Sequence, residues 1–123
     1  GWWMLFEPEL HFGDDVVVPD LAGWRRERMP IVPETAYFAL APDWVCEVLS
    51  PSTARLDRHR KLDVYAREGV RHIWLLDPIP RILEVLRLDD RQWKIVSVYA
   101  GDDEVCAEPF EATTLSLHRL WTD

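Results

Sequence analysis

Residues 44–76 carry the order strand, helix, strand, and this order constrains the fold more than any other part of the sequence. Residues 44–49 are a short apolar run, residues 54–68 have the periodicity of an amphipathic helix, and residues 72–76 are a second apolar run. Two strands joined through one helix over so short a distance run parallel, with a right-handed crossover. The sequence therefore predicts a sheet that contains a βαβ unit.

The predicted helix has clear ends and one charge on its inward side. Residues 50–53, Ser-Pro-Ser-Thr, break the first strand and supply hydroxyl groups that can cap the helix. Gly69 is expected to end the helix in a left-handed conformation. On the helical wheel Lys61 lies in the stripe of Leu62 and Tyr65, the stripe expected to pack on the sheet. An ammonium group is therefore directed toward the interior.

The first strand of the unit is apolar on both faces except at Glu47. Alternate residues of a strand point to opposite faces, so Glu47 shares a face with Val45 and Leu49. A buried carboxylate without a partner costs several kcal/mol, so Glu47 requires a cation, a proton or a basic partner. Lys61 is the nearest candidate, because its helix is expected to pack back over this strand.

The residues before this unit predict two further strands. Residues 2–6 are apolar, and Trp2 and Trp3 must either pair into the sheet or pack on another segment. Residues 16–18 form a β-branched run that a proline stops. Asp20 is therefore expected just past the end of a strand.

The segments on either side of these elements are predicted with less regular structure. Residues 21–42 contain one glycine, Gly23, and three prolines, which favours an irregular connection with one short helical turn near 34–40. Residues 81–88 and 92–99 alternate around an Asp-Asp-Arg turn and predict a β-hairpin. Two short segments complete the expected elements: a strand at 105–107 and a helical turn at 115–121.

The order of these elements predicts an α+β domain with a mixed β-sheet, a βαβ crossover and flanking helices. A chain of 123 residues has the length of one domain, so residues 1–123 are expected to fold as a single unit. Apolar residues make up 48% of the chain and charged residues 29%, which is enough to build a core without disulfide or metal cross-links.

The net charge of −8 argues against a protein that coats nucleic acid without specificity, because such binding depends on Lys and Arg. It does not exclude a nuclease, since carboxylates hold metal ions and a local basic patch can guide a strand. Basic residues are concentrated in and beside the predicted helix: Arg55, Arg58, Arg60, Lys61, Arg67 and Arg71.

Cysteine usage and hydropathy bear on location. The two cysteines have no CxxC spacing, and Cys46 lies inside the apolar strand, which indicates a buried reduced thiol. No run approaches the roughly 18 apolar residues of a membrane span, and no signal peptide is visible. The sequence therefore predicts a cytoplasmic protein without membrane association.

Asp20, Glu47 and Lys61 are the residues that could carry chemistry. Two carboxylates and one lysine are the smallest protein set for Mg²⁺, an ion that takes few protein ligands and keeps water molecules. Such an ion can hold a phosphate oxygen and lower the pKa of a water molecule, which is what phosphodiester hydrolysis requires. Structural roles are the alternative: Asp20 as a turn residue, and Lys61 in an ion pair with Glu47 or with Asp57 one turn earlier.

A combined pattern of motifs resembles one protein family. It consists of these pieces: EVLSPST at 47–53, Asp57-Arg58, Lys61, Tyr65, Gly69-Val70, HIWLLDP at 72–78, and Val18-Pro19-Asp20 upstream. Together they resemble the bacterial Uma-type family of restriction endonucleases, within the PD-(D/E)XK nuclease superfamily. The resemblance covers nearly the whole chain, and the combination is far more specific than any one piece.

The resemblance implies a restriction-endonuclease-like core and assigns roles to the candidate residues. Asp20 matches the Asp of the PD motif and Glu47 the acidic residue of the (D/E)XK motif, so both are expected to bind Mg²⁺. The motif's lysine is absent, because Leu49 stands two residues after Glu47. In this family the lysine is expected to come from the helix, which points to Lys61. Such cores also begin with a helix, and this chain is expected to lack that segment.

Two functions follow as hypotheses. The first is a Mg²⁺-dependent DNA endonuclease, with Mn²⁺ as a substitute ion, in which Ser50 hydrogen-bonds near the site and Arg58 contacts phosphate. The second is a non-catalytic binding or assembly module that keeps the nuclease fold. A homodimer is expected for either, and the hairpin at 81–99 offers an exposed edge for it.

Overall fold

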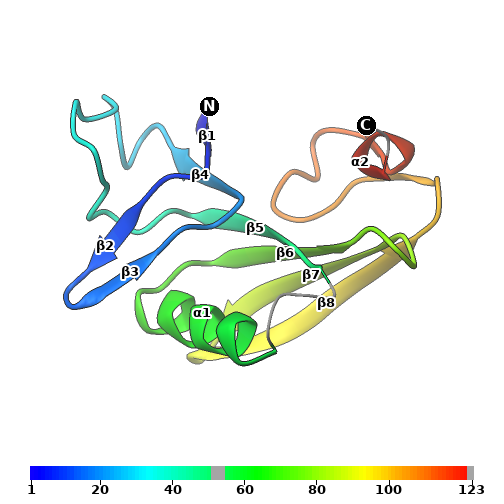
Figure 1. Ribbon diagram of the computed structural model, residues 1–123. Coiled ribbons are helices and arrows are strands. Elements are labelled where there is room, and N and C mark those ends of the chain that lie inside the picture. Colours follow the sequence, from blue (N-terminus) through cyan, green and yellow to red (C-terminus); the bar gives the residue numbers. More distant parts are fainter. Residues whose placement is uncertain (51–54, 122–123) are drawn as a thin grey trace.

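The structure, a computed structural model, describes residues 1–50 and 55–121. Its main element is a six-stranded sheet in the order β1-β4-β5-β6-β7-β8 (Figure 1). The pair β5–β6 is parallel and every other pair of neighbours is antiparallel, as expected for a mixed sheet around a βαβ unit. The strands have these bounds: β1 Trp2–Phe6, β4 Leu21–Arg25, β5 Trp44–Val48, β6 His72–Asp77, β7 Ile82–Asp89 and β8 Gln92–Ala100.

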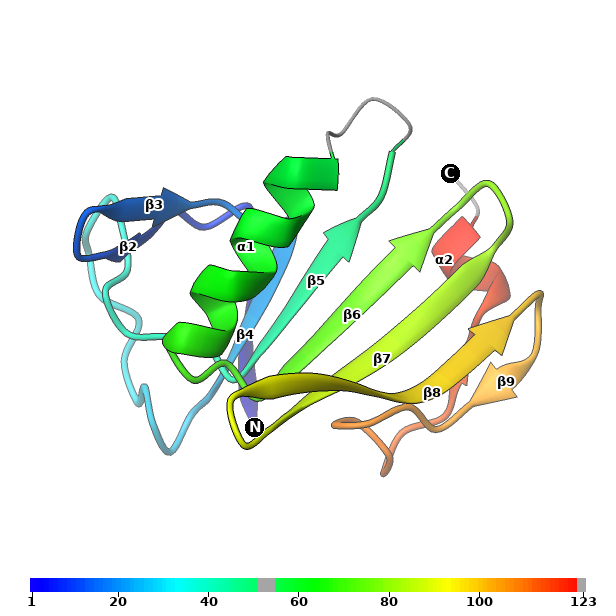
Figure 2. The same ribbon diagram turned by 90° about the horizontal axis from the view of Figure 1, so that it is seen from below.

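Each face of the sheet is covered by different segments. Helix α1 (Arg55–Arg67) lies on one face, with the small hairpin of β2 (Leu10–Phe12) and β3 (Asp15–Val17) at its side (Figure 2). The opposite face is covered by the C-terminal segment, with β9 (Glu104–Val105), β10 (Leu115–Ser116) and α2 (His118–Trp121). The sheet therefore separates two hydrophobic cores.

The predicted alternation of β5 is confirmed. Val45 packs into the core beneath α1, together with the fully buried Tyr65 of the helix. Trp44 and Cys46 pack into the core on the opposite face. Cys46 is a buried free thiol. Burial is the main cause that raises its pKa above the usual value, and the negative charges of nearby carboxylates raise it further.

The predicted helix and hairpin are also confirmed, with small shifts at their ends. Gly69 follows α1 with φ of +79°, the left-handed conformation expected of it. The turn between β7 and β8 places Asp90 and Arg91 at positive φ as well. The predicted capping residues at 51–53 lie outside the described residues. Neither helix in the described part of the chain is both long and apolar enough to cross a membrane.

The prediction of an irregular connection over 21–42 was wrong at its start. Residues 21–25 form β4, which lies between β1 and β5 in the sheet. A glycine at position 23 favours a loop, but a Cβ atom at Gly23 would lie 2.8 Å from Met4 Sδ and 3.2 Å from the Trp44 ring. The glycine therefore lets large side chains pack directly over the strand.

Two further boundaries differ from prediction. No helical turn forms near 34–40; instead the backbone of Phe38 bonds to Glu9 and His11 in a bridge beside β2, a non-local pairing. At the C-terminus, Leu115–Ser116 pairs with β9 as a strand, and the helical turn begins only at His118. In both places pairing with a distant segment overrides the local signal.

Trp2 and Trp3 lie in β1 and are part-buried, so of the two alternatives left open by the sequence the structure shows pairing into the sheet. The guanidinium of Arg25 lies 4.5 Å from the centre of the Trp2 ring, and that of Arg26 lies 4.0 Å from the Trp3 ring. Trp3 Nε1 donates to the carbonyl of Met29 at 2.8 Å. Cation–π contacts and this hydrogen bond therefore fix the first strand against β4 and the residues that follow it.

Glu108 fastens the C-terminal segment to the sheet. Its carboxylate lies 2.7 Å from His72 Nε2 and 3.2 Å from the Arg87 guanidinium, and its carbonyl accepts a hydrogen bond from Trp74 Nε1. Partial burial acts to raise the pKa of Glu108, but the hydrogen bond from His72 and the charge of Arg87 outweigh it and lower the pKa. Because the pKa of Glu108 is lowered in the folded protein, its ionised form stabilises the fold at pH values above the ordinary pKa of a carboxyl group.

Replacing Glu108 by Gln is expected to lower the free energy of unfolding by about 1 kcal/mol at neutral pH. The difference should vanish as the pH falls through the lowered pKa, because the wild-type carboxyl is then protonated as well. Urea unfolding at neutral pH and at about pH 3 measures both values. Glu104→Gln, at an exposed position of β9, serves as the control. An equal loss at both pH values would contradict the ionic role.

Candidate active site

Two carboxylates meet where β4 begins and β5 ends. Asp20 directly precedes β4, rather than following a strand as predicted, because β3 already ends at Val17. Leu21 pairs with Cys46, so the antiparallel register carried one residue further places Asp20 opposite Glu47. Asp20 Oδ2 accepts a hydrogen bond from the backbone N–H of Val48 at 2.6 Å. The end of β5 thus holds Asp20 beside Glu47.

Lys61 reaches this place from α1. Its Nζ lies 3.2 Å from Glu47 Oε1 and donates to the carbonyl of Val18 at 2.9 Å. Glu47 is only 7% exposed, and its second oxygen, Oε2, accepts a hydrogen bond from the hydroxyl of Tyr65 at 2.6 Å. The structure therefore brings Asp20, Glu47 and Lys61 together. In the described part of the chain, the ion-pair partner of Lys61 is Glu47 and not Asp57.

Burial dominates the electrostatics of this group. Desolvation raises the pKa of Glu47, the Tyr65 hydrogen bond and the Lys61 ammonium oppose that rise, and the charge of Asp20 adds to it. Burial and the adjacent Glu47 also raise the pKa of Tyr65, so its phenol keeps its proton and acts as a donor. The carboxylate of Glu47 therefore has one charged and one neutral donor from the same helix.

These residues line a cavity of about 110 Å³, which has room for a few water molecules. Arg58 lies on its wall, whereas Ser50 is exposed and follows directly after the lining residue Leu49. The cavity lining comprises Asp20, Glu47, Val48, Leu49, Asp57, Arg58, Lys61 and Leu62.

Sequence reasoning did not single out Tyr65 as a site residue. Its signal was present, because Tyr65 follows Lys61 by four positions and lies in the same inward stripe of the helix. A buried phenol needs a hydrogen-bond partner, and the buried Glu47 needs a donor. The backbone groups of Val18 and Val48 that complete the site leave no such trace in a sequence.

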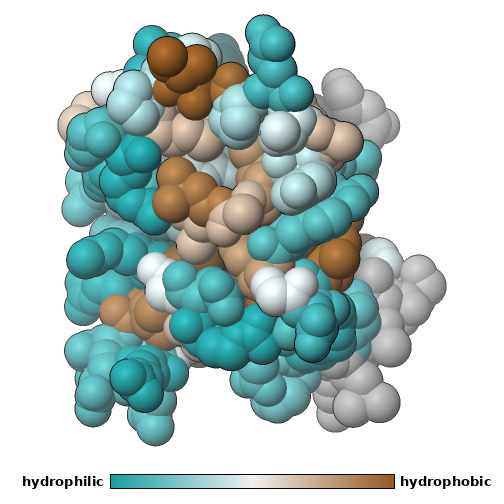
Figure 3. Space-filling view, turned by 90° about the vertical axis from the view of Figure 1, so that its left-hand side faces the viewer, coloured by the Kyte–Doolittle hydropathy of each residue, from teal (hydrophilic) through white to brown (hydrophobic). Residues whose placement is uncertain are grey.

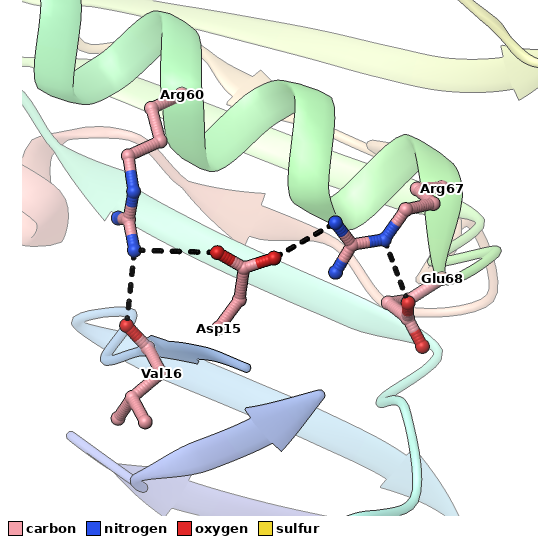
Figure 4. Close-up of polar contacts among 5 residues, drawn as sticks. All are labelled: Asp15, Val16, Arg60, Arg67 and Glu68. Atoms are coloured by element: carbon pink, nitrogen blue, oxygen red, sulfur yellow. Dashed lines mark hydrogen bonds and ion pairs between the residues drawn. The ribbon is translucent and has the colours of Figure 1, made fainter. Parts of the chain in front are cut away.

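The basic patch expected around the helix is smaller in the structure, because part of it is neutralised. The carboxylate of Asp15, on the β2–β3 hairpin, lies 2.8 Å from Arg67 NH1 and 3.9 Å from Arg60 NH2 (Figure 4). Arg67 also pairs with Glu68 at 2.9 Å, and Arg60 donates to the carbonyl of Val16 at 3.4 Å. The hairpin is therefore held against the helix by ion pairs. Among the described residues that line the cavity, Arg58 is the arginine.

Replacing Asp15 by Ala is expected to loosen the hairpin from α1. Amide hydrogen exchange in the hairpin should become about threefold to fivefold faster, while exchange in β5 and β6 stays unchanged. Hydrogen exchange followed by mass spectrometry measures this. Asp14→Ala is the matched control, because Asp14 is exposed in the same hairpin turn. Equal acceleration in both variants would show that the ion pairs with Arg60 and Arg67 do not hold the hairpin.

The donor set of the cavity suits a hard cation. The carboxylates of Asp20 and Glu47 both lie in it, and the described residues contain no cluster of three or more His, Cys, Asp or Glu arranged around a metal position. Mg²⁺ takes one or two carboxylates and keeps several water molecules, whereas zinc sites usually need three or four protein ligands. The residues present therefore fit Mg²⁺ or Mn²⁺ and not a structural zinc ion.

The chain is similar to known proteins in sequence and in structure. The Uma2 family, described as "Putative restriction endonuclease", matches residues 3–118. A solved structure, described as "a putative nuclease belonging to DUF820 from Anabaena variabilis ATCC 29413", is similar with 26% identity and a TM-score of 0.76. That similarity covers 98% of this chain and 68% of the other. No match is found among curated proteins.

The similarity of structure confirms the predicted α+β fold with a restriction-endonuclease-like mixed sheet. Asp20, the strand that carries Glu47 and the helix that carries Lys61 all lie within the matched residues. The match covers most of the sequence, from β1 to the start of α2. The chain belongs to the Uma2 family, the family described as "Putative restriction endonuclease".

Proposed function

We propose that this chain is a Mg²⁺-dependent endonuclease that hydrolyses phosphodiester bonds of DNA, with Asp20 and Glu47 as ligands of the ion. The observation that carries the proposal is the meeting of two carboxylates from adjacent positions of the sheet with the Lys61 ammonium in one cavity. The membership of the family and the similarity to a nuclease structure support it.

The chemistry divides between the ion and the side chains. Mg²⁺, when bound, polarises the phosphate and lowers the pKa of a water molecule. Lys61 supplies a fixed positive charge beside Glu47, and two of its three N–H groups are directed to Glu47 and Val18. The contacts among the described residues use two of the N–H groups of Lys61, so the third N–H can orient the attacking water or a phosphate oxygen.

Tyr65 and Arg58 have supporting roles in this proposal. The hydroxyl of Tyr65 fixes one oxygen of Glu47 and so holds the carboxylate in one orientation. Arg58 lines the cavity, and a guanidinium pairs with phosphate oxygens through two parallel hydrogen bonds. Arg58 therefore positions the strand at the cavity, where the net charge of −8 would otherwise repel it.

A second candidate is a non-catalytic module that keeps the nuclease fold. The observation in its favour is that both oxygens of Glu47 already accept hydrogen bonds, one from Lys61 and one from Tyr65. A carboxylate satisfied in this way can be a structural ion pair that needs no metal. Under this reading the cavity is a by-product of the helix packing and binds no ion.

Plasmid nicking and calorimetric titration separate the two candidates. The endonuclease should bind Mg²⁺ or Mn²⁺ in the calorimeter and convert supercoiled plasmid to the nicked form only when the ion is present. Binding that disappears in the variant Asp20→Asn would support the assigned ligands. If the folded protein neither takes up either ion nor nicks DNA, the module is the better account.

A further inference from the structure

Strand β1 lies at one edge of the six-stranded sheet. In the part of the chain that the structure describes, β1 pairs on one side only, with β4, and it lies at the upper edge of the sheet in Figure 1. All five residues of β1 are apolar, and Phe6 is 84% exposed and Met4 44% exposed. Edge strands normally carry a charge, a proline or a bulge that prevents pairing, and β1 carries none.

The hydrogen bonds to β4 determine which backbone groups of β1 face outward. Arg26 N–H donates to the carbonyl of Gly1, and Glu7 N–H donates to the carbonyl of Asp20, both at 3.0 Å. Bonded residues alternate along an antiparallel strand, so the odd-numbered residues from 1 to 7 are directed to β4. The even-numbered residues 2, 4 and 6 therefore present their N–H and C=O groups away from the sheet.

This spacing is self-complementary. If Met4 lies on a two-fold axis, it pairs with Met4 of the second copy, and Trp2 pairs with Phe6 of the second copy at each end. Each of the three pairs is then of the type that exchanges two backbone bonds, which gives about six hydrogen bonds across the axis. A shift by one residue would oppose groups that are already bonded to β4, and a shift by two would leave two such pairs in place of three, so this register forms the most backbone hydrogen bonds.

The side chains of these residues match in the same register. Trp2, Met4 and Phe6 share the face opposite α1, because Trp2 packs against the core on that face. Each exposed Phe6 would lie across from a Trp2 of the other copy, and aromatic cross-strand pairs stabilise antiparallel sheets. Met4 and Leu21 also border an apolar cavity of about 340 Å³ on this face. The apolar surface at the axis is therefore wider than the strand itself.

The alternative surfaces are less suited to pairing. The β8 edge, which the sequence suggested for a dimer, has a register shift opposite Val85 and Leu86, and a bulge twists an edge away from straight pairing. The connection at 26–43 exposes Ile31 and Tyr37, but the apolar surface on that side is broken into separate patches by hydrophilic residues (Figure 3). Neither offers a straight, uncharged strand.

We propose that β1 pairs antiparallel with β1 of a second copy of this chain, with Met4 at the two-fold axis. The two six-stranded sheets then join into one continuous sheet. Both helices α1, and with them both candidate active sites, lie on the same face of the joined sheet. The interface stands on the geometry of β1 alone and does not depend on the proposed nuclease activity.

A cysteine cross-link tests the register directly. In the paired strands the Cα atoms of the two Met4 residues are about 5.5 Å apart, a distance that a disulfide spans. Met4→Cys, made in a Cys106→Ser background to remove the exposed native thiol, should form a covalent dimer under mild oxidation. Ile95→Cys, at a 60% exposed position on the β8 edge, is the matched control and should form no covalent dimer under the same oxidation.

Light scattering on the protein without new cysteines gives an independent measurement. The protein should have the mass of a dimer, and Phe6→Lys should raise the dissociation constant at least about tenfold, because it places an ammonium at the aromatic pair. Ile31→Lys, at an 81% exposed position on the connection, should leave the mass unchanged.

Two results would overturn the proposal. One is a monomeric mass together with cross-linking of Met4→Cys no greater than that of Ile95→Cys. The other is a monomeric mass for a form extended before Gly1 when the present chain dimerises, since the edge would then belong to the added segment and not to a second copy.

Discussion

Glu47→Gln is expected to lower the rate of Mg²⁺-dependent DNA cleavage by about a hundredfold or more, with the fold retained. The amide keeps the size of the carboxylate and can still accept a hydrogen bond from Tyr65 or Lys61. It removes the negative charge that holds the ion, so the calorimetric signal for Mg²⁺ should weaken together with the nicking rate. Circular dichroism and thermal unfolding verify that the variant is folded.

Glu84→Gln is the matched control for this variant. Glu84 lies on β7 at the same level of the sheet, since Glu47 pairs with Leu75 and Leu75 pairs with Glu84. It has no place in the cavity lining, so its loss should leave cleavage and Mg²⁺ binding unchanged. Full cleavage by Glu47→Gln would remove the carboxylate from the mechanism, and equal losses in both variants would point to a general effect on the sheet.

Lys61→Met is expected to reduce cleavage by a similar factor and also to destabilise the fold by about 2 kcal/mol. The thioether keeps most of the packing volume of the lysine stem but leaves Glu47 ionised, buried and with only Tyr65 as donor. The estimate is below that for a fully buried pair, because the Lys61 side chain is 20% exposed. Denaturant unfolding measures the free energy, and plasmid nicking measures the activity.

The double variant Glu47→Gln/Lys61→Met separates a catalytic pair from a structural one. Removing both charges should restore most of the stability that Lys61→Met loses, because no unpaired charge then stays buried. Cleavage should stay as low as in the single variants. Lys94→Met, which removes an exposed lysine from its pair with Asp89, should alter neither quantity. Recovery of both stability and cleavage would contradict the catalytic assignment.

The sequence by itself determined the centre of the fold and the contact between two of the three charged site residues. The βαβ unit follows from local patterns, since its two strands are continuous apolar runs and its helix has an apolar stripe between them. Glu47 and Lys61 broke these patterns, and Lys61 was the nearest candidate partner for the buried charge of Glu47. Their predicted contact is confirmed at 3.2 Å because strand and helix are adjacent in both sequence and space.

Only the tertiary structure decided how the distant segments meet. The sequence showed β4 as a loop because Gly23 breaks local patterns, yet the strand forms because β1 and β5 supply its hydrogen-bond partners on both sides. Asp20 reaches Glu47 through that pairing, and Val48 N–H and Val18 C=O complete the site from backbone groups that every residue possesses. Such contacts depend on register between separate strands, and register is set by the assembled sheet and not by any single segment.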